Sequence, residues 1–213
     1  MRYKFPRIYH FSDSPNLQND DRRHEDESVF IGKEVCASIK MDGEATSIYK
    51  DYIHARSIDS KKHPSREWIK QLQGKIGYLI PDNFRLCGEN LYAVHSIEYR
   101  NLKSYFYLYA IFNENNYVLS WDDTITWSKL LELELVDVFY RGVYNRKFIH
   151  EKFEEHSNLS LDNIEGYVVR IADSFHYEDY SKYSVKYVRL GHVQTNEHWM
   201  TKKVIPNGLK IMH

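Results

Sequence analysis

The sequence lacks several features that would assign the protein to a particular class. It has no run of about 18 apolar residues, as a membrane-spanning helix needs, and no basic-then-apolar N-terminus like that of a signal peptide. It has only two cysteines, Cys36 and Cys87, and no Cys-x-x-Cys or His-x3-His spacing typical of zinc sites. Internal repeats are also missing. We therefore expect a soluble, cytoplasmic protein with reduced and buried thiols, and no membrane partner.

An excess of one charge is missing as well. The net charge is −1, so no overall basic field indicates a nucleic-acid partner. The polar stretch 19–27 is interpreted as an exposed, solvated loop. The C-terminal part is locally basic, because one acid, Glu197, stands against six bases: Lys182, Lys186, Arg189, Lys202, Lys203 and Lys210.

Apolar and aromatic residues are abundant enough for a sizeable core. Hydrophobic residues make up 42% of the chain and aromatic residues 15%, including 18 tyrosines. Alternating apolar residues predict strands at 34–39, 45–50, 52–56, 84–89, 106–112, 136–140, 164–171 and 183–190. Capping residues and apolar spacing predict helices at 65–73, 122–135 and 145–156, with Asp122 or Asp123 capping the second and Gly74 ending the first.

The most informative stretch is Lys40-x-Asp42-Gly43-Glu44, which stands between two of the predicted strands. Asp-Gly favours a tight, hairpin-like turn, because glycine tolerates positive φ. Desolvation lowers the pKa of a half-buried lysine and makes its amine a candidate nucleophile. The alternative is a surface lysine in an ordinary hairpin.

Four further patterns follow along the chain. Arg56 comes directly after a predicted strand, 16 residues beyond Lys40, and a Gly-Glu pair ends another strand at Glu89. Glu165 begins a strongly apolar run, where an acid needs a cation, a metal or hydrogen bonds. Lys186 lies within the last predicted strand. Each pattern alone also fits a solvent-exposed strand end or ordinary core packing.

In this order, the five patterns resemble the motifs of the covalent nucleotidyltransferases: RNA ligases, DNA ligases and mRNA-capping guanylyltransferases. The resemblance spans roughly residues 30 to 192 and is strongest to RNA ligases, especially the RNA ligase 2-like group. It implies an α+β fold, the ATP-grasp-like nucleotidyltransferase domain, with two packed antiparallel sheets, flanking helices and a nucleotide cleft. It implies an ATP-dependent RNA ligase that needs Mg²⁺ (or Mn²⁺) and joins 5′-phosphate to 3′-hydroxyl ends through a lysyl-AMP and an adenylylated RNA.

The resemblance also assigns roles to single residues. Lys40 would be the nucleophile, and Lys186 would balance charge on the α-phosphate. The metal would lie at Glu165, with Asp42 and Glu89 near it. The nucleotide contacts would come from Ser38, Ile39, Asp42, Gly43, Arg56, Glu89, Tyr109, Lys186 and Arg189, although strand alternation would turn Arg189 to the face opposite Lys186.

The sequence departs from the family pattern at three points. Ala110 follows Tyr109, where the pattern usually has an aspartate, and Ser38 and Ile39 stand where some relatives have a glutamate before the nucleophile. Only 24 residues follow Arg189, too few for the appended OB-fold of roughly 100 residues in DNA ligases and capping enzymes. We expect a monomer with one nucleotidyltransferase domain over the whole chain, and the choice between ATP and GTP stays open.

The basic C-terminal stretch is the predicted contact with RNA. Lys202 and Lys203, together with His192 and His198, would hold the polynucleotide, since basic residues contact phosphates and rings stack on unpaired bases. This tail resembles that of small bacterial and phage RNA ligase-family proteins; the alternative is a tail that only packs on the domain. Two other functions stay open: a catalytically silent nucleic-acid-binding module, and a capping-like enzyme or DNA ligase with another acceptor.

Overall fold

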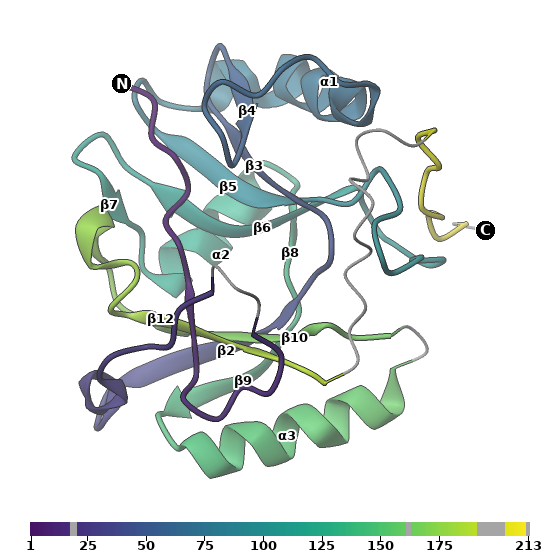
Figure 1. Cartoon of the computed structure of the whole chain (residues 1–213). Coiled ribbons are helices and arrows are strands. Elements are labelled where there is room, and N and C mark those ends of the chain that lie inside the picture. Colours follow the sequence, from purple (N-terminus) through teal and green to yellow (C-terminus); the bar gives the residue numbers. More distant parts are fainter. Residues whose placement is uncertain (18–20, 161–162, 191–202, 212–213) are drawn as a thin grey trace.

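Two facing β-sheets form the body of the protein in the computed structural model, which describes residues 1–17, 21–160, 163–190 and 203–211 (Figure 1). Sheet A has five strands in the order β1-β12-β10-β2-β9 within these residues, and only the pair β1–β12 is parallel. Its strands are β1 (Tyr9–His10), β2 (Glu34–Lys40), β9 (Val138–Val143), β10 (Gly166–Ile171) and β12 (Ser184–Val188).

Sheet B has seven strands in the described part of the chain. Six follow the order β11-β7-β6-β5-β3-β4, and β8 pairs in parallel with β6. The strands are β3 (Glu44–Ile48), β4 (Ile53–Ala55), β5 (Arg85–Asn90), β6 (Phe106–Phe112), β7 (Tyr117–Val118), β8 (Glu134–Leu135) and β11 (Phe175–His176). The predicted α+β fold of two packed, mainly antiparallel sheets with flanking helices is therefore confirmed.

Three α-helices flank the sheets in the described residues: α1 (Glu67–Ile76), α2 (Trp121–Leu130) and α3 (Arg146–Leu159). Short 3-10 turns lie at Glu27–Phe30, Pro64–Arg66, Gly77–Leu79 and Tyr177–Asp179. In Figure 1, α3 lies along the outer side of sheet A and α1 lies next to β4 of sheet B. None of the helices that the structure describes has the length and apolarity that crossing a bilayer would require.

All three predicted helices have other ends in the structure, and α3 continues past residue 156 to Leu159. Helix α1 continues through Gly74 and ends at Ile76, which is buried. Helix α2 is capped by Ser120, whose hydroxyl accepts a hydrogen bond from the Asp123 N–H, and it stops at Leu130. The chain turns at Glu132, where φ is +53°, so that the next residues can pair with β6.

The predicted hairpin around Lys40 is wrong, because β2 and β3 belong to different sheets. The residues between them form a crossover from sheet A to sheet B. Gly43 does not have positive φ. A Cβ at Gly43 would lie 2.6 Å from the carbonyl oxygen of Asn90. The glycine is therefore required by the close approach of two backbone segments, and not by the conformation of a tight turn.

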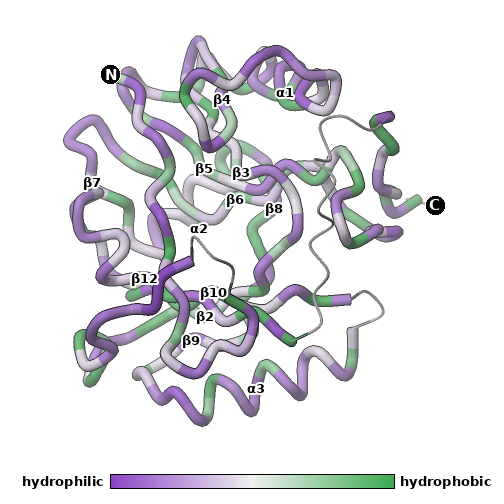
Figure 2. The backbone as a smooth tube through the Cα atoms, viewed as in Figure 1, coloured by the Kyte–Doolittle hydropathy of each residue, from purple (hydrophilic) through white to green (hydrophobic). Residues whose placement is uncertain are grey.

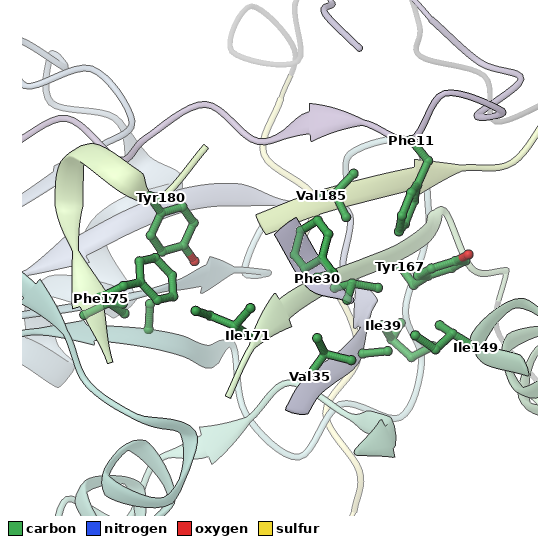
Figure 3. Close-up of a cluster of buried hydrophobic side chains, with 14 of the residues drawn as sticks. Phe11, Phe30, Val35, Ile39, Ile149, Tyr167, Ile171, Phe175, Tyr180 and Val185 are labelled. Carbon is green, nitrogen blue, oxygen red and sulfur yellow. The ribbon is translucent and has the colours of Figure 1, made fainter. Parts of the chain in front are cut away.

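Alternation along the strands gives sheet A two different faces. The residues Val35 and Ile39 of β2 and Tyr167 of β10 pack in one cluster with Ile149 and the rest of the apolar side of α3 (Figure 3). Figure 2 shows apolar positions spaced between hydrophilic ones along α3. The side chains between them in sequence face sheet B. That second face of sheet A forms one wall of the cavity described below.

The N-terminal segment spans from one sheet to the other. The N–H of Tyr3 donates to the hydroxyl of Tyr49, just after β3, and the ring of Phe5 lies 5.0 Å from that of Tyr109 on β6. Further on, β1 pairs with β12 of sheet A. This segment, purple in Figure 1, therefore closes one side of the space between the sheets.

Candidate active site

A cavity of about 240 Å³ lies between the two sheets. Its walls come from sheet A, sheet B and the N-terminal segment. Seven residues that the sequence singled out line it: Ser38, Ile39, Lys40, Arg56, Glu89, Tyr109 and Lys186. Folding thus brings into one cavity positions that lie far apart in the sequence.

Lys40 is the last residue of β2, and its amine is held by an acid. Its Nζ lies 2.6 Å from Oε2 of Glu165, whose side chain is only 3% exposed. Burial opposes the charge on Lys40, but the carboxylates of Glu165 and Glu89 outweigh burial and raise the pKa of the amine. The expectation that desolvation lowers this pKa is therefore wrong, because the acidic neighbours dominate.

The glycine after Glu165 has a packing reason. Gly166 pairs with Lys40 on one side and with Val188 of β12 on the other. A Cβ on Gly166 would lie 1.9 Å from the carbonyl oxygen of Tyr187. A larger residue would push β10 away from β12 and would displace Glu165 from Lys40. The Glu-Gly pair therefore combines a buried acid with the close strand contact that positions it.

Glu89 faces the same cavity from sheet B, opposite Ala45 in the register of β5 and β3. Burial raises the pKa of the Glu89 carboxyl to about 8; the nearby Glu165 carboxylate adds to the rise and Lys40 opposes it. Two acids thus flank the lysine amine. Carboxylate oxygens suit Mg²⁺, which binds proteins through one or two carboxylates plus substrate phosphates. In the described residues, no group of three or more His, Cys, Asp or Glu could hold a metal by itself.

Asp42, Gly43 and Glu165 are not among the described residues that line the cavity, although Glu165 contacts Lys40, which does. The Oδ2 of Asp42 accepts hydrogen bonds from the Ser96 N–H, the Ser96 hydroxyl and the Ile97 N–H at 2.7–2.8 Å. The N–H of Asp42 donates to the hydroxyl of Tyr99. The structure therefore places Asp42 as the anchor of the loop after β5, and one of its oxygens is fully used there.

One part of the cavity has the shape that a flat ring requires. Tyr109 of β6 is half-buried, and Phe5 contacts its ring edge-on. On the side of sheet A lie Val168 and Ser38, which are paired in register. An aromatic ring opposite a branched apolar side chain suits a nucleobase. Arg56, exposed directly after β4, also lines the cavity.

Lys186 has a partner that the sequence did not indicate. Its Nζ lies 3.0 Å from Oδ1 of Asp21, and Oδ2 of Asp21 lies 3.1 Å from Nε2 of the buried His10. Backbone hydrogen bonds between His10 and residues 22–24 hold Asp21 in this place. Burial lowers the pKa of Lys186, and Asp21 opposes that shift. The second lysine of the cavity is thus largely neutralised by an acid from the N-terminal segment.

Comparison with known proteins identifies the family of this chain. A sequence model described as RNA ligase matches residues 33–188, which include Lys40, Glu89, Glu165 and Lys186. The chain belongs to the RNA ligase family. No curated protein matches it.

The fold is similar to that of solved structures of the RNA ligase of Naegleria gruberi. One variant with ATP and Mn has a TM-score of 0.51 at 17% identity, over 78% of this chain and 52% of that one. A second variant, with AMP and Mn, has a TM-score of 0.51 at 18% identity, over 76% of this chain and 51% of that one. A third variant, with ATP and Mn, has a TM-score of 0.52 at 15% identity, over 88% of this chain and 60% of that one. The chain thus spans about half of the length of the solved chains, or slightly more.

The residues expected to contact RNA, and Arg189, lie apart from the cavity or outside the described residues. Arg189 follows β12, and its Nη1 donates to the hydroxyl of Ser157 on α3, on the face of sheet A away from the cavity. Alternation explains this orientation, and we do not assign Arg189 to the site. Lys203 is exposed, at the start of the segment 203–211. The other three predicted RNA-binding residues, His192, His198 and Lys202, lie outside the described residues.

Several cavity residues were not predicted: Phe5, Ile8, Asp21, Cys36 and Arg170. Asp21 lies in the polar stretch that was interpreted as a solvated loop, and it precedes the part that matches the RNA ligase family. A run of charges gives no signal of which member turns inward. Arg170 could have been found, because an arginine in an apolar run needs a partner just as Glu165 does.

Proposed function

We propose that this protein is an ATP-dependent RNA ligase that joins 5′-phosphate and 3′-hydroxyl ends of RNA through a lysyl-AMP and an adenylylated RNA. The observation that carries the proposal is the contact of 2.6 Å between Glu165 and Nζ of Lys40, which lines the same cavity as Lys186. A lysine amine between acids, with a second amine nearby, suits attack on a metal-bound phosphate. The similar Naegleria structures that contain ATP or AMP with Mn support the same choice of ligand.

In the first step, Lys40 Nζ attacks the α-phosphorus of ATP. A nitrogen–phosphorus bond forms, and the phosphorus–oxygen bond to pyrophosphate breaks. The amine must lose its proton in order to react, and Glu165 Oε2 lies within proton-transfer reach. Lys186 offsets the negative charge that develops at the α-phosphate.

The other cavity residues would hold the nucleoside. Tyr109 stacks on the base, with Val168 and Ser38 of sheet A on the opposite side; Ile39 also lines the cavity. Glu89 and Arg56 bind the ribose or the phosphates, since a carboxylate accepts from hydroxyl groups and a guanidinium pairs with phosphate. These contacts align the α-phosphorus with the amine of Lys40, which is how positioning speeds such a reaction.

Mg²⁺ or Mn²⁺ is the metal that these side chains fit. Glu165 and Glu89 present carboxylate oxygens, and the elevated pKa of Glu89 indicates a carboxyl group that a cation would return to its charged form. Asp42 could contribute only its other oxygen, or a bridging water, because Oδ2 is occupied. When bound, the metal neutralises the phosphates and lowers the pKa of the Lys40 amine.

In the later steps, the AMP passes from Lys40 to the 5′-phosphate of an RNA, and a 3′-hydroxyl displaces it. We assign the RNA contacts to the basic tail, namely His192, His198, Lys202 and Lys203, because basic side chains bind phosphates. We also propose that residues 1–213 act as a single nucleotidyltransferase domain.

ATP or GTP labelled at the α-phosphate, followed by denaturing electrophoresis, tests the proposal. Label from ATP should stay on the wild-type protein and be absent from Lys40→Ala. Label from GTP alone would indicate a capping-like enzyme, and no label on the wild type would indicate a catalytically silent nucleic-acid-binding module. A second assay offers nicks with 5′-phosphorylated RNA or DNA, and joining of DNA alone would make the protein a DNA ligase.

A further inference from the structure

The inner end of the cavity carries a row of polar side chains that the proposed chemistry does not use. The strand register places Cys36 beside Arg170 and Arg170 beside Ser184. Cys36 and Arg170 line the cavity together with Tyr180, and we call these three residues the cavity floor. In sequence, Cys36 precedes Lys40 by four residues, so the floor lies about 13 Å along the strand from the nucleophile at about 3.3 Å per residue.

Arg170 is buried, yet its guanidinium is poorly satisfied. The side chain is 4% exposed. Nη1 and Nη2 donate to the backbone carbonyls of Tyr109 and Leu119, both at a long 3.4 Å. Nε has no hydrogen-bond partner, and none of the ion pairs among the described residues includes Arg170. Its other favourable neighbours are the ring of Trp121, 5.2 Å away, and the hydroxyl of Tyr180.

Two other buried arginines of this protein have stronger hydrogen-bond or ion-pair partners. Arg66, 6% exposed, makes two hydrogen bonds to the carboxylate of Glu44. Arg85, 1% exposed, lies over the ring of Phe112 at 3.9 Å and donates to an asparagine oxygen at 2.6 Å. A buried cation without a charged partner is unfavourable. Arg170 differs from these two because it lines a cavity, where a ligand can supply what the protein does not.

The neighbours of Arg170 on the floor are neutral donors. Burial raises the pKa of the Cys36 thiol to about 11, so the thiol stays protonated. Burial also raises the pKa of the Tyr180 hydroxyl, which Figure 3 shows at one end of the apolar cluster. A floor of one cation and two neutral donors fits a ligand group that accepts hydrogen bonds.

We propose that Arg170 reads the nucleobase: its guanidinium donates to a ring-nitrogen acceptor on the purine edge that points to the cavity floor. The inference rests on the proposed function, since it takes ATP as the ligand. A base stacked on Tyr109, with its phosphates at Lys40 and Lys186, directs its far edge toward the floor. Stacking alone accepts every base, whereas a fixed donor at the edge distinguishes one base from another.

The test is equilibrium binding of ATP, 1-deaza-ATP and 7-deaza-ATP, in which carbon replaces one ring nitrogen. The proteins all carry Lys40→Ala, so that no covalent step follows binding. We expect one analogue to bind about tenfold or more weakly than ATP, the range for a hydrogen bond from a charged donor. With Arg170→Met added, ATP should lose a similar factor, and the difference between ATP and that analogue should disappear.

Arg141→Met is the matched control, because Arg141 lies on β9 of the same sheet and pairs with Glu34 and Asp122 at the surface. It should leave the affinity for ATP and its analogues unchanged. Arg170→Lys keeps a charged donor and tests the same point if the methionine variant does not fold: it should retain part of the analogue difference.

Two results would overturn the inference alone: equal binding of ATP and both analogues, or a difference between them that persists in Arg170→Met. No binding of ATP would overturn the inference together with the proposed function. Failure of the proposed function alone would appear as normal ATP binding in these experiments, with no label transferred to the protein that retains Lys40.

Discussion

Asp21 lies where a nucleotide phosphate would approach Lys186, so its charge should oppose nucleotide binding. Its carboxylate is 3.0 Å from the amine of Lys186. A phosphate that binds Lys186 must displace this carboxylate or bind beside it, and the two negative groups repel each other. The substitution Asp21→Asn keeps the shape and removes the charge. We expect this variant to bind ATP more tightly than the wild type does.

The size of the effect follows from the exposure of the ion pair. The side chains of Lys186 and Asp21 are 18% and 21% exposed. Fully exposed pairs contribute about 1 kcal/mol or less, and an effective dielectric constant of about 20 would allow several kcal/mol before desolvation is subtracted. A value of about 1.4 kcal/mol lies between these limits and corresponds to roughly tenfold tighter binding. The gain should shrink at higher ionic strength, because solvent reaches both groups.

Calorimetric titration with ATP measures this difference in proteins that also carry Lys40→Ala. Asp13→Asn serves as the control, because Asp13 belongs to the same N-terminal segment but is exposed and pairs with Arg146. Its affinity for ATP should equal that of the parent protein. If Asp21→Asn binds ATP equally or more weakly, the reasoning is refuted, and Asp21 orients Lys186 instead of competing with phosphate.

Four further outcomes are expected. Lys40→Arg should take up no label from ATP in the gel assay, since a guanidinium stays protonated and is no nucleophile. Glu165→Gln should slow adenylylation at least about a hundredfold, and a near-normal rate would mean that another acid binds the metal. Burial lowers the pKa of His54 below 6.5, so the unfolding free energy should fall as the pH drops below that value; His54→Gln should flatten this dependence in urea titrations. Replacing Lys202 and Lys203 by Ala should leave self-adenylylation unchanged but weaken RNA binding and flatten its salt dependence; unchanged RNA binding would show a structural tail.

Strand positions could be predicted from the sequence, but strand partners could not. The predicted strand at 106–112 coincides with β6 (Phe106–Phe112), and the apolar run at 164–171 contains β10. Alternation determines which side chains share a face. Pairing depends on contacts between distant residues, so the two-sheet architecture came from the motif resemblance and not from periodicity.

The error at the crossover after Lys40 shows this limit clearly. Asp-Gly between two strands favours a hairpin when only neighbouring residues are considered. In the structure, Gly43 is needed because Asn90, 47 residues later, passes within contact distance of it. The turn rule therefore identified Gly43 as a position that needs glycine, but the reason is a close contact and not a turn.

The cavity was predicted where a charged residue stands out against an apolar background, and missed where it does not. Lys40 and Lys186 interrupt strand patterns and line the cavity, and Glu165, which precedes an apolar strand, contacts Lys40. Asp21 comes from a stretch in which nearly every residue is polar, so its inward orientation has no local signal. Its place is set by backbone pairing to His10, which only the fold reveals.

The Lys-x-Asp-Gly pattern also connects the two sheets, in addition to providing the proposed nucleophile. Lys40 ends a strand of sheet A, and Glu44 begins a strand of sheet B. Between them, Asp42 is tied to the loop after β5 by hydrogen bonds to Ser96 and Ile97. The amine is thus attached to one wall of the cavity, while the residues that follow it are fixed to the other. The two walls carry different parts of the site and would hold the nucleotide together. The distance between the Lys40 amine and that nucleotide therefore depends on the short connection between the walls. Asp42 belongs to this connection, so it affects the distance although it does not line the cavity.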